Sequence, residues 1–231
     1  MTEVRLDAAG DGVSVLTLSG KGNAMDAGVF RDLRDAAATV RRDGTRALVI
    51  TGAGSVFCAG FDLAALPALR ALTVPEFLDL EDLASGAIGA LHRLPFPVLA
   101  AVNGAAAGGG LSLALAADIR LASTDATFSA AFARVGFSVG ELGTSWMLTR
   151  LVGPGIAAEL SFTARRVDAA EAHHIGLVER LTAPDALADA ALTLARTLAE
   201  SDPQRISKRD ALVDGELASF ESALLTRTVR S

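Results

Sequence analysis

The spacing of hydrophobic residues changes several times along the chain, and each change predicts a different element. Residues 13–18 partly alternate between apolar and polar side chains, which predicts a strand. Residues 26–42 place apolar side chains at helical spacing with charged residues on the opposite side, which predicts an amphipathic helix. Residues 47–50 are continuously apolar, as is typical of a strand that is covered on both faces.

The stretch from residue 94 to residue 117 carries no charge and is long enough to resemble a transmembrane helix, which needs about 20 apolar residues. Pro95, Pro97, Asn103 and a cluster of glycines interrupt it, however, and such residues end helices or form turns. We therefore predict a strand, a turn and a buried helix. The alternation of strands and helices predicts an α/β fold with crossover connections.

The remaining segments are less regular. Residues 63–90 predict a loop and one helix, and residues 119–145 predict a short strand pair with a glycine-spaced turn. Short helices are expected around residues 157–160 and 169–172, and a longer helix over residues 185–200 after Pro184. Asp202 and Pro203 should break this helix before a final helical segment.

Composition narrows the range of functions. A chain of 231 residues suits one domain that can carry a small appendage, and 51% hydrophobic residues argue against disorder. The net charge of −6 offers no general attraction to nucleic acid or to an acidic membrane. The first residues lack the layout of a secretion signal, which favours the cytoplasm. The single cysteine, Cys58, sits in an apolar stretch and is expected to be a small buried hydrophobe rather than a reactive thiol.

Two glycine-bearing segments, residues 57–63 and 103–110, each follow an apolar run and expose bare backbone. Backbone N–H groups can hold a developing negative oxygen where no side chain blocks the approach, so the segments together predict an oxyanion site. Tight packing of a strand against a helix is the alternative interpretation. A phosphate-binding loop is disfavoured, because neither segment completes a dinucleotide fingerprint or a P-loop.

These segments, with others in the same order, resemble the enoyl-CoA hydratase/isomerase (crotonase) superfamily. Each motif is weak alone, but six in the right order are strong evidence. The resemblance implies a ββα spiral core at residues 1–182 and an α-helical tail at 183–231 that helps to form a trimer, often a dimer of trimers. The motifs lie at residues 23–25, 47–54, 97–104, 116–120, 143–146 and 175–178.

The resemblance also implies acyl-CoA thioester substrates and an enolate-like anion at the thioester carbonyl. The oxyanion donors would be the backbone N–H groups of Phe61 and Gly109. No separate cofactor is implied, because coenzyme A is part of the substrate. Lys21 would lie near the CoA phosphates, although a solvated surface lysine is an equal alternative. The other residues implied to line the CoA path are Ala59, Asp62, Leu63 and Ala64.

The proton-transfer residues depart from the family pattern. Typical hydratases carry two glutamates at the positions that hold Ser112 and Phe132 here, and neither of these side chains can act as a carboxylate. Glu141, in a glycine-spaced and otherwise apolar loop, falls where some isomerase relatives carry a catalytic acid. The alternative for Glu141 is a helix N-terminal charge that favours the helix dipole.

Other candidates are disfavoured. Ser112 lacks the Gly-x-Ser-x-Gly elbow of a serine nucleophile, so a helix serine bonded to a backbone carbonyl is expected. His92, His173 and His174 show no metal-ligand spacing, so no metal site is predicted. The expected function is that of an acyl-CoA enzyme with doubtful hydratase activity. The rivals are a double-bond isomerase, decarboxylase or biosynthetic crotonase that uses Glu141, and a non-catalytic acyl-CoA binding protein.

Overall fold

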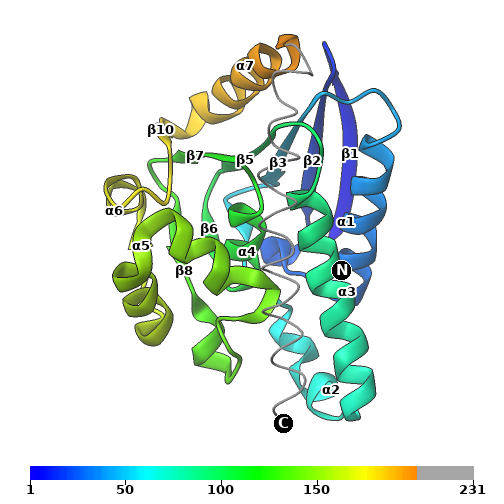
Figure 1. Ribbon diagram of the computed structural model, residues 1–231, viewed down its shortest axis with the longest axis vertical. Helices are drawn as coiled ribbons and strands as arrows, with labels where there is room; N and C mark the ends of the chain where they lie inside the picture. The colour runs from blue at the N-terminus through cyan, green and yellow to red at the C-terminus, as the bar shows by residue number, and fades with distance from the viewer. Residues whose placement is uncertain (202–231) are drawn as a thin grey trace.

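The computed structural model describes residues 1–201 and arranges them as two sheets with helices around them (Figure 1). The larger sheet has the strand order β1-β2-β3-β5-β7-β10, and the smaller has the order β4-β6-β8-β9. The strands are β1 (Glu3–Gly10), β2 (Val13–Ser19), β3 (Ala47–Gly52), β4 (Val56–Cys58), β5 (Val98–Val102), β6 (Ala105–Ala107), β7 (Ile119–Ser123), β8 (Thr127–Ser129), β9 (Val167–Asp168) and β10 (Arg180–Thr182).

A strand–strand–helix unit repeats along the chain. In the pairs β3–β4, β5–β6 and β7–β8, the first strand joins the larger sheet and the second joins the smaller one. Within each sheet these strands pair in parallel with the corresponding strands of the next unit, so each unit adds one strand to each sheet. The α-helices are α1 (Ala27–Val40), α2 (Leu66–Arg70), α3 (Val74–His92), α4 (Gly109–Leu115), α5 (Thr144–Thr163), α6 (Ala169–His174) and α7 (Leu187–Glu200).

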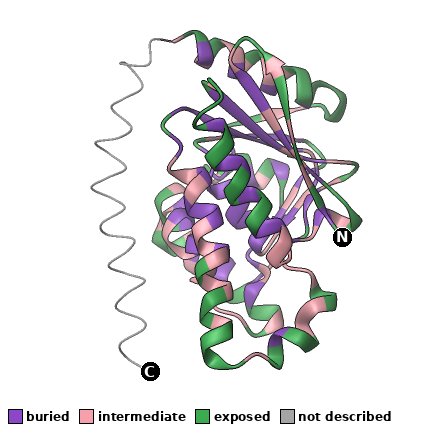
Figure 2. Cartoon of the chain, turned by 90° about the vertical axis from the view of Figure 1, so that its right-hand side faces the viewer, coloured by how far each residue is buried: buried purple, intermediate pink, exposed green. Residues whose placement is uncertain are grey.

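The central strands of the larger sheet are largely buried (Figure 2), and apolar side chains cover both of its faces. One face packs in the main core with α1, α3 and the smaller sheet. The other face carries Val49, Leu99 and Leu121, which pack against Leu187 and Ala191 of α7. The continuous apolar run of β3 is explained by this double burial.

Several predictions from the hydrophobic pattern are confirmed. The predicted strands correspond to β2 and β3, and the predicted amphipathic helix corresponds to α1. The uncharged stretch is divided into β5, β6 and the buried helix α4, as its prolines and glycines predict. No helix within residues 1–201 is both long enough and apolar enough to cross a membrane.

Other expectations were wrong. Residues 63–90 contain two α-helices rather than a loop and one helix, because Pro67 and Pro75 lie in the first turns of α2 and α3, where proline is tolerated. The segment around residue 157 belongs to the 20-residue helix α5, which bends at Gly153. Strand β1 was missed. The predicted break at residue 202, the final helical segment and most of the proposed tail lie outside the described residues.

Candidate active site

The two glycine-bearing segments meet in the folded chain. Gly60 follows β4 with φ +91°, and a Cβ atom placed on it would lie 2.5 Å from the Ala107 carbonyl oxygen and 3.2 Å from the Gly109 nitrogen. A Cβ atom on Gly109 would lie 2.8 Å from Cε of Met25. The two backbones therefore approach each other at a distance that only glycine permits.

The local hydrogen bonding leaves two backbone N–H groups beside this contact. A parallel bridge joins Phe61 to Met25: the Met25 N–H donates to the Gly60 carbonyl, and the Asp62 N–H donates to the Met25 carbonyl, both at 2.8 Å. The bridge thus uses the neighbours of Phe61 and not the Phe61 N–H. Gly109 is the first residue of α4, where N–H groups have no acceptor within the helix.

Two asparagines from the sequence motifs hold the loop between β3 and β4. The buried Asn23 side chain donates to the carbonyls of Ala53 (3.0 Å) and Val56 (2.6 Å). Asn103 donates to the Gly54 carbonyl at 2.8 Å and accepts from the Gly52 N–H at 3.2 Å. Because these bonds fix the chain just before Gly60, the asparagines position the glycine backbone rather than face a ligand.

Phe61 and Gly109 line the same cavity, which has a volume of about 60 Å³ and opens to solvent. Its walls are apolar except for two carboxyl side chains, those of Glu81 and Glu141. Such a cavity excludes much of the water around a bound group and strengthens electrostatic interactions inside it. The apolar walls are formed mainly by Phe30, Leu69, Leu80, Phe132, Phe137 and Leu142.

Glu141 reaches the cavity from the short 3₁₀ helix η4 (Glu141–Gly143) that precedes α5. The N-cap of α5 is Gly143, and no side chain caps that helix. The position of the Glu141 carboxyl in the cavity wall favours the proton-transfer interpretation over the helix-end interpretation.

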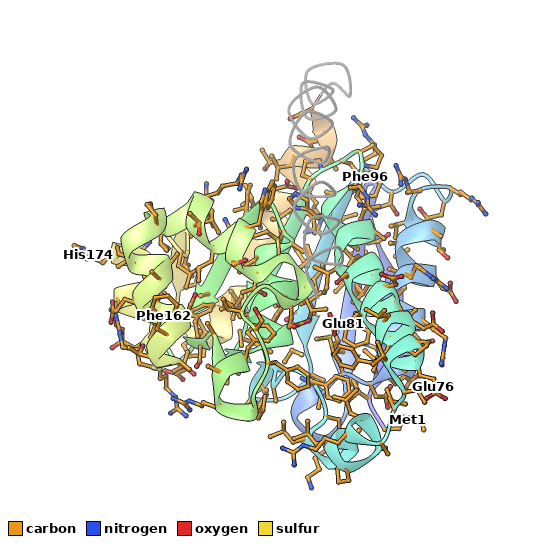
Figure 3. The ribbon with its side chains drawn as sticks, turned by 60° about the horizontal axis from the view of Figure 1, so that its bottom comes forward. Met1, Glu76, Glu81, Phe96, Phe162 and His174 are labelled. Atoms are coloured by element: carbon orange, nitrogen blue, oxygen red, sulfur yellow. The ribbon has the colours of Figure 1, made fainter. Side chains whose placement is uncertain are left out.

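Glu81 was not identified from the sequence. It lies half-buried on α3, on the side that faces the interior, whereas Glu76 at the start of the same helix is exposed (Figure 3). Burial, a side-chain hydrogen bond with Glu141 and the charge of Glu141 raise the pKa of Glu81 to about 9. The available signal was its helical spacing from Phe77 and Ala84, which places an acid on the apolar side of α3.

The two positions that carry glutamates in typical hydratases hold no proton carrier. The Ser112 hydroxyl is buried in α4 and bonds to the Thr144 hydroxyl at 2.6 Å and to the Gly108 carbonyl at 3.3 Å. Phe132 forms part of the cavity wall. Burial raises the pKa of the Cys58 thiol to about 12, so Cys58 is unreactive at neutral pH.

Of the residues expected along the CoA path, Phe61 and Gly109 line the cavity, and the others flank Phe61 in the sequence or, for Lys21, lie in a separate segment. The Ala59 N–H donates to the Gly22 carbonyl at 2.9 Å, which places Lys21 in the adjoining segment. The Asp62 carboxylate accepts from the Ala64 N–H at 3.0 Å and caps the 3₁₀ helix η2 (Leu63–Ala65). In the part of the chain that the structure describes, no group of three or more His, Cys, Asp and Glu residues could hold a metal ion.

Other motif residues have structural contacts away from the cavity. Arg120 is buried, and its guanidinium donates to the carbonyls of Leu177 (2.9 Å) and Ala117 (2.7 Å) and pairs with Glu179. The Asp118 carboxylate accepts from the Val98 N–H at 2.8 Å. These bonds tie the β7 segment to its neighbours, so the two motifs at residues 116–120 and 175–178 stabilise the fold.

The repeated strand–strand–helix units define an α/β protein, and two glycine-bearing segments meet beside its cavity. A family model described as enoyl-CoA hydratase/isomerase matches residues 8–225, and the chain belongs to this family. A crystal structure described as "putative enoyl-CoA hydratase from Streptomyces coelicolor A3(2)" superimposes with a TM-score of 0.87 and 37% identity, covering 96% of this chain and 86% of that chain. The fold is therefore the crotonase fold.

Curated relatives carry names from the same family. A Mycobacterium leprae (strain TN) protein named "Probable enoyl-CoA hydratase echA12" is 41% identical over 203 residues, which cover 85% of this chain and 69% of the relative. The protein of that name from Mycobacterium tuberculosis (strain ATCC 25618 / H37Rv) is 43% identical over 182 residues, which cover 77% and 64%. The chain thus spans about two thirds of the length of these relatives.

Proposed function

We propose that this protein binds an acyl-CoA thioester and moves a proton at the α-carbon, or at the γ-carbon of an unsaturated acyl group. The N–H groups of Phe61 and Gly109 would bind the thioester oxygen, and Glu141 would accept and return the proton. One observation carries the proposal: all three residues line the same cavity. Membership of the enoyl-CoA hydratase/isomerase family supports the thioester substrate.

The chemistry follows from the charges. Removing a proton from the α-carbon, or from the γ-carbon of a 2,3-unsaturated acyl group, places negative charge on the thioester oxygen. Backbone donors aimed at that oxygen stabilise it, and one such donor is typically worth ~10²–10³ in rate. The Glu141 carboxylate lies in the same cavity and accepts the proton, a role typically worth ~10²–10⁴.

Water addition is not the reaction that these residues favour. Hydration needs one group to activate water and another to protonate carbon. Ser112 and Phe132 occupy the positions where typical hydratases carry those glutamates, as the family resemblance implies. Double-bond isomerisation, decarboxylation or a biosynthetic reaction with one proton carrier therefore fits the site better than hydration.

The remaining parts of the proposal concern the rest of the substrate and the assembly. Ala59, the backbone from Phe61 to Ala64, and Lys21 would contact the CoA portion, and no cofactor besides this substrate is proposed. We also propose a cytoplasmic homotrimer or dimer of trimers. Light scattering at micromolar concentration should give a multiple of the 23.6 kDa chain mass, and a monomer would contradict the assembly.

Isotope exchange tests the reaction. The protein is incubated in deuterium oxide with crotonyl-CoA and with its 3,4-unsaturated isomer, and both exchange at carbon and hydration are followed. We expect exchange at the α- or γ-carbon and very slow hydration. Fast hydration would contradict the proposal, because some other group would then replace the missing glutamates.

A second candidate function is supported by the same two positions, where Ser112 and Phe132 stand in place of the glutamates of typical hydratases. A chain that has lost both hydratase glutamates could bind acyl-CoA without turnover. Thermal protection by acyl-CoA, together with no exchange or conversion across a panel of acyl chains, would establish this binding function and reject the catalytic one.

A further inference from the structure

Glu81 and Glu141 reach the cavity from two different elements, α3 and η4, that pack against each other. Their carboxyl groups interact through a side-chain hydrogen bond. No lysine or arginine within the described residues lines this cavity. The two acids therefore face each other without a cation to neutralise either of them, and a hydrogen bond between two carboxyl groups requires a proton on one of them.

We propose that Glu81 is a positioning residue that keeps one proton between the two carboxyl groups and thereby holds the Glu141 carboxylate towards the bound acyl group. This rests on the proposed function of Glu141. In this arrangement the protonated Glu81 donates to the ionised Glu141, and the pair carries a single negative charge. Glu81 lies on the nineteen-residue helix α3, and it thus orients Glu141, which lies on a single turn of 3₁₀ helix.

The electrostatics of the site support this assignment of the proton. Two neighbouring carboxylates in an apolar cavity cannot readily both ionise, so one of them holds its proton at neutral pH. Burial and the neighbouring Glu141 raise the pKa of Glu81 to about 9, and we place the shared proton on Glu81. The pair titrates as a unit, and its last proton leaves as the pH rises through that value.

The other charged groups around α3 add no cation to the pair. Asp82 on the same helix raises the pKa of Glu81 further. Helix α1 contributes Phe30 to the cavity, while the charged side chains along α1 and those of the neighbouring Arg70 and Arg134 are exposed. The exposed charges on α1 are Arg31, Asp32, Arg34 and Asp35.

The local backbone explains why Glu141 needs a partner. Gly140 precedes it, and Leu142 after it has φ +56°, a left-handed conformation that is uncommon for leucine. The Glu141 backbone donates to the Ser138 carbonyl and accepts from the Thr144 hydroxyl, whereas the contact of its carboxyl is with Glu81. We infer that this contact orients the carboxyl. A carboxylate held in this way loses less conformational freedom when it accepts a proton from the substrate.

Two substitutions of Glu81 separate positioning from bulk packing. Glu81→Gln keeps a hydrogen-bond donor of similar size but cannot ionise, whereas Glu81→Leu removes the donor. Exchange at the α- or γ-carbon is measured from pH 6 to pH 10. At pH 7 we expect Glu81→Gln to remain within about threefold of the parent and Glu81→Leu to lose roughly 10–100-fold, part of what acid–base catalysis supplies.

The pH profile gives the sharper readout. In the parent, exchange should fall as the pH rises through about 9, because ionised Glu81 no longer donates and repels Glu141. Glu81→Gln should lack this alkaline fall. Asp79→Leu, an exposed position on the same helix, is the control and should keep the parent profile. Normal activity in Glu81→Leu, an unchanged alkaline fall in Glu81→Gln, or a loss in Glu81→Gln as large as that in Glu141→Gln would overturn the proposal.

Direct titration tests the pair even if the parent catalyses no exchange, an outcome that would reject only the proposed function. Carboxyl carbon NMR should show Glu81 titrating near pH 9 in the parent and at lower pH in Glu141→Gln, since the charged partner is gone. A Glu81 carboxyl that titrates near its ordinary value of 4.5 in the parent would show that the shared proton does not exist.

Discussion

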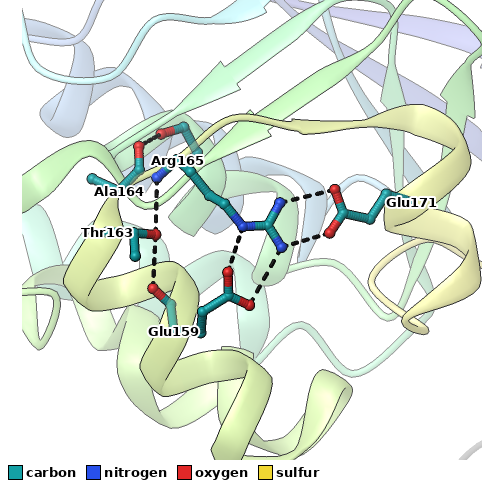
Figure 4. A network of polar contacts seen from close by, with 6 residues as sticks. Glu159, Thr163, Ala164, Arg165 and Glu171 are labelled. Carbon is teal, nitrogen blue, oxygen red and sulfur yellow. Dashed lines mark hydrogen bonds and ion pairs between the residues drawn. The ribbon is translucent and has the colours of Figure 1, made fainter.

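Two pairs of glutamates in this protein have opposite surroundings. Glu159 on α5 and Glu171 on α6 both bind Arg165, with Nε 2.6 Å from the Glu159 carboxylate and Nη2 2.6 Å from the Glu171 carboxylate (Figure 4). Arg165 holds the pKa of both carboxyls below the usual range. Glu81 and Glu141 meet in an apolar cavity without a cation, and the pKa of Glu81 is raised instead.

The difference shows what separates a structural acid from a proton carrier. A carboxylate that is bound to arginine stays ionised and links two helices, so it has little tendency to accept a proton. A carboxyl group beside a second carboxyl, in apolar surroundings, keeps its proton to a higher pH than a free carboxyl does. The position of one arginine therefore distinguishes the corner between α5 and α6 from the candidate active site.

The largest expected effect comes from removing the proton-carrying acid. Glu141→Gln keeps size and hydrogen bonding but cannot carry a proton, so exchange at the α- or γ-carbon should fall by ~10²–10⁴. Glu171→Gln is the matched control at the Arg165 pair and should leave exchange unchanged. Unchanged exchange in Glu141→Gln would mean that Glu141 is only a helix-end charge.

A smaller effect is expected on the stability of the folded protein when Glu81 is replaced. Unfolded Glu81 ionises near 4.5 and folded Glu81 near 9, so between these values only the folded state keeps the proton. The free energy of unfolding therefore decreases as the pH rises through this window. Glu81→Gln cannot ionise, so it removes this pH-dependent loss of stability. It should melt ~2–4 °C above the parent at pH 9, a shift that corresponds to ~1 kcal/mol at this chain length.

Thermal melts of the parent and Glu81→Gln at pH 5, 7 and 9 check this. The difference should be small at pH 5 and grow towards pH 9. A difference that does not change with pH would show that the substitution acts through packing and not through the raised pKa.

The smallest effect is expected at the Arg165 pair, where the sign is reversed. The lowered pKa of Glu171 stabilises the fold at pH values above its ordinary 4.5, and this stabilisation is lost as the pH falls through the lowered value. Glu171→Gln should therefore melt slightly below the parent at pH 7, by less than the shift in Glu81→Gln at pH 9, and salt should reduce the difference. A melting temperature higher than that of the parent would contradict the assigned role of Arg165.

Much of the fold could be predicted because apolar periodicity reports burial. The pattern located β2, β3 and α1, and proline and glycine correctly divided the uncharged stretch before α4. Strand β1 was missed although Val4 and Leu6 alternate with charged residues, because an edge strand with one exposed face has few apolar positions. Helix α2 was missed because the two prolines made residues 63–90 look irregular, although both lie in the first turns of helices.

The candidate site was only partly predictable. Glycines report close backbone contact, so the two glycine-bearing segments could be placed together from the sequence, and the family resemblance singled out Phe61 and Gly109 within them. Glu81 could not be recognised because it lies between Asp79 and Asp82, and such a run of acids is typical of a solvated helix face. Only the packing of α3 against η4 brings the Glu81 carboxyl to Glu141.

A crystal structure with a short acyl-CoA bound would test the central claim most directly. The account predicts that the thioester oxygen lies ~2.7–3.1 Å from the N–H groups of Phe61 and Gly109, with Glu141 the carboxyl nearest the α-carbon and Glu81 behind it. A thioester bound outside this cavity, or an α-carbon next to no carboxyl group, would contradict the account.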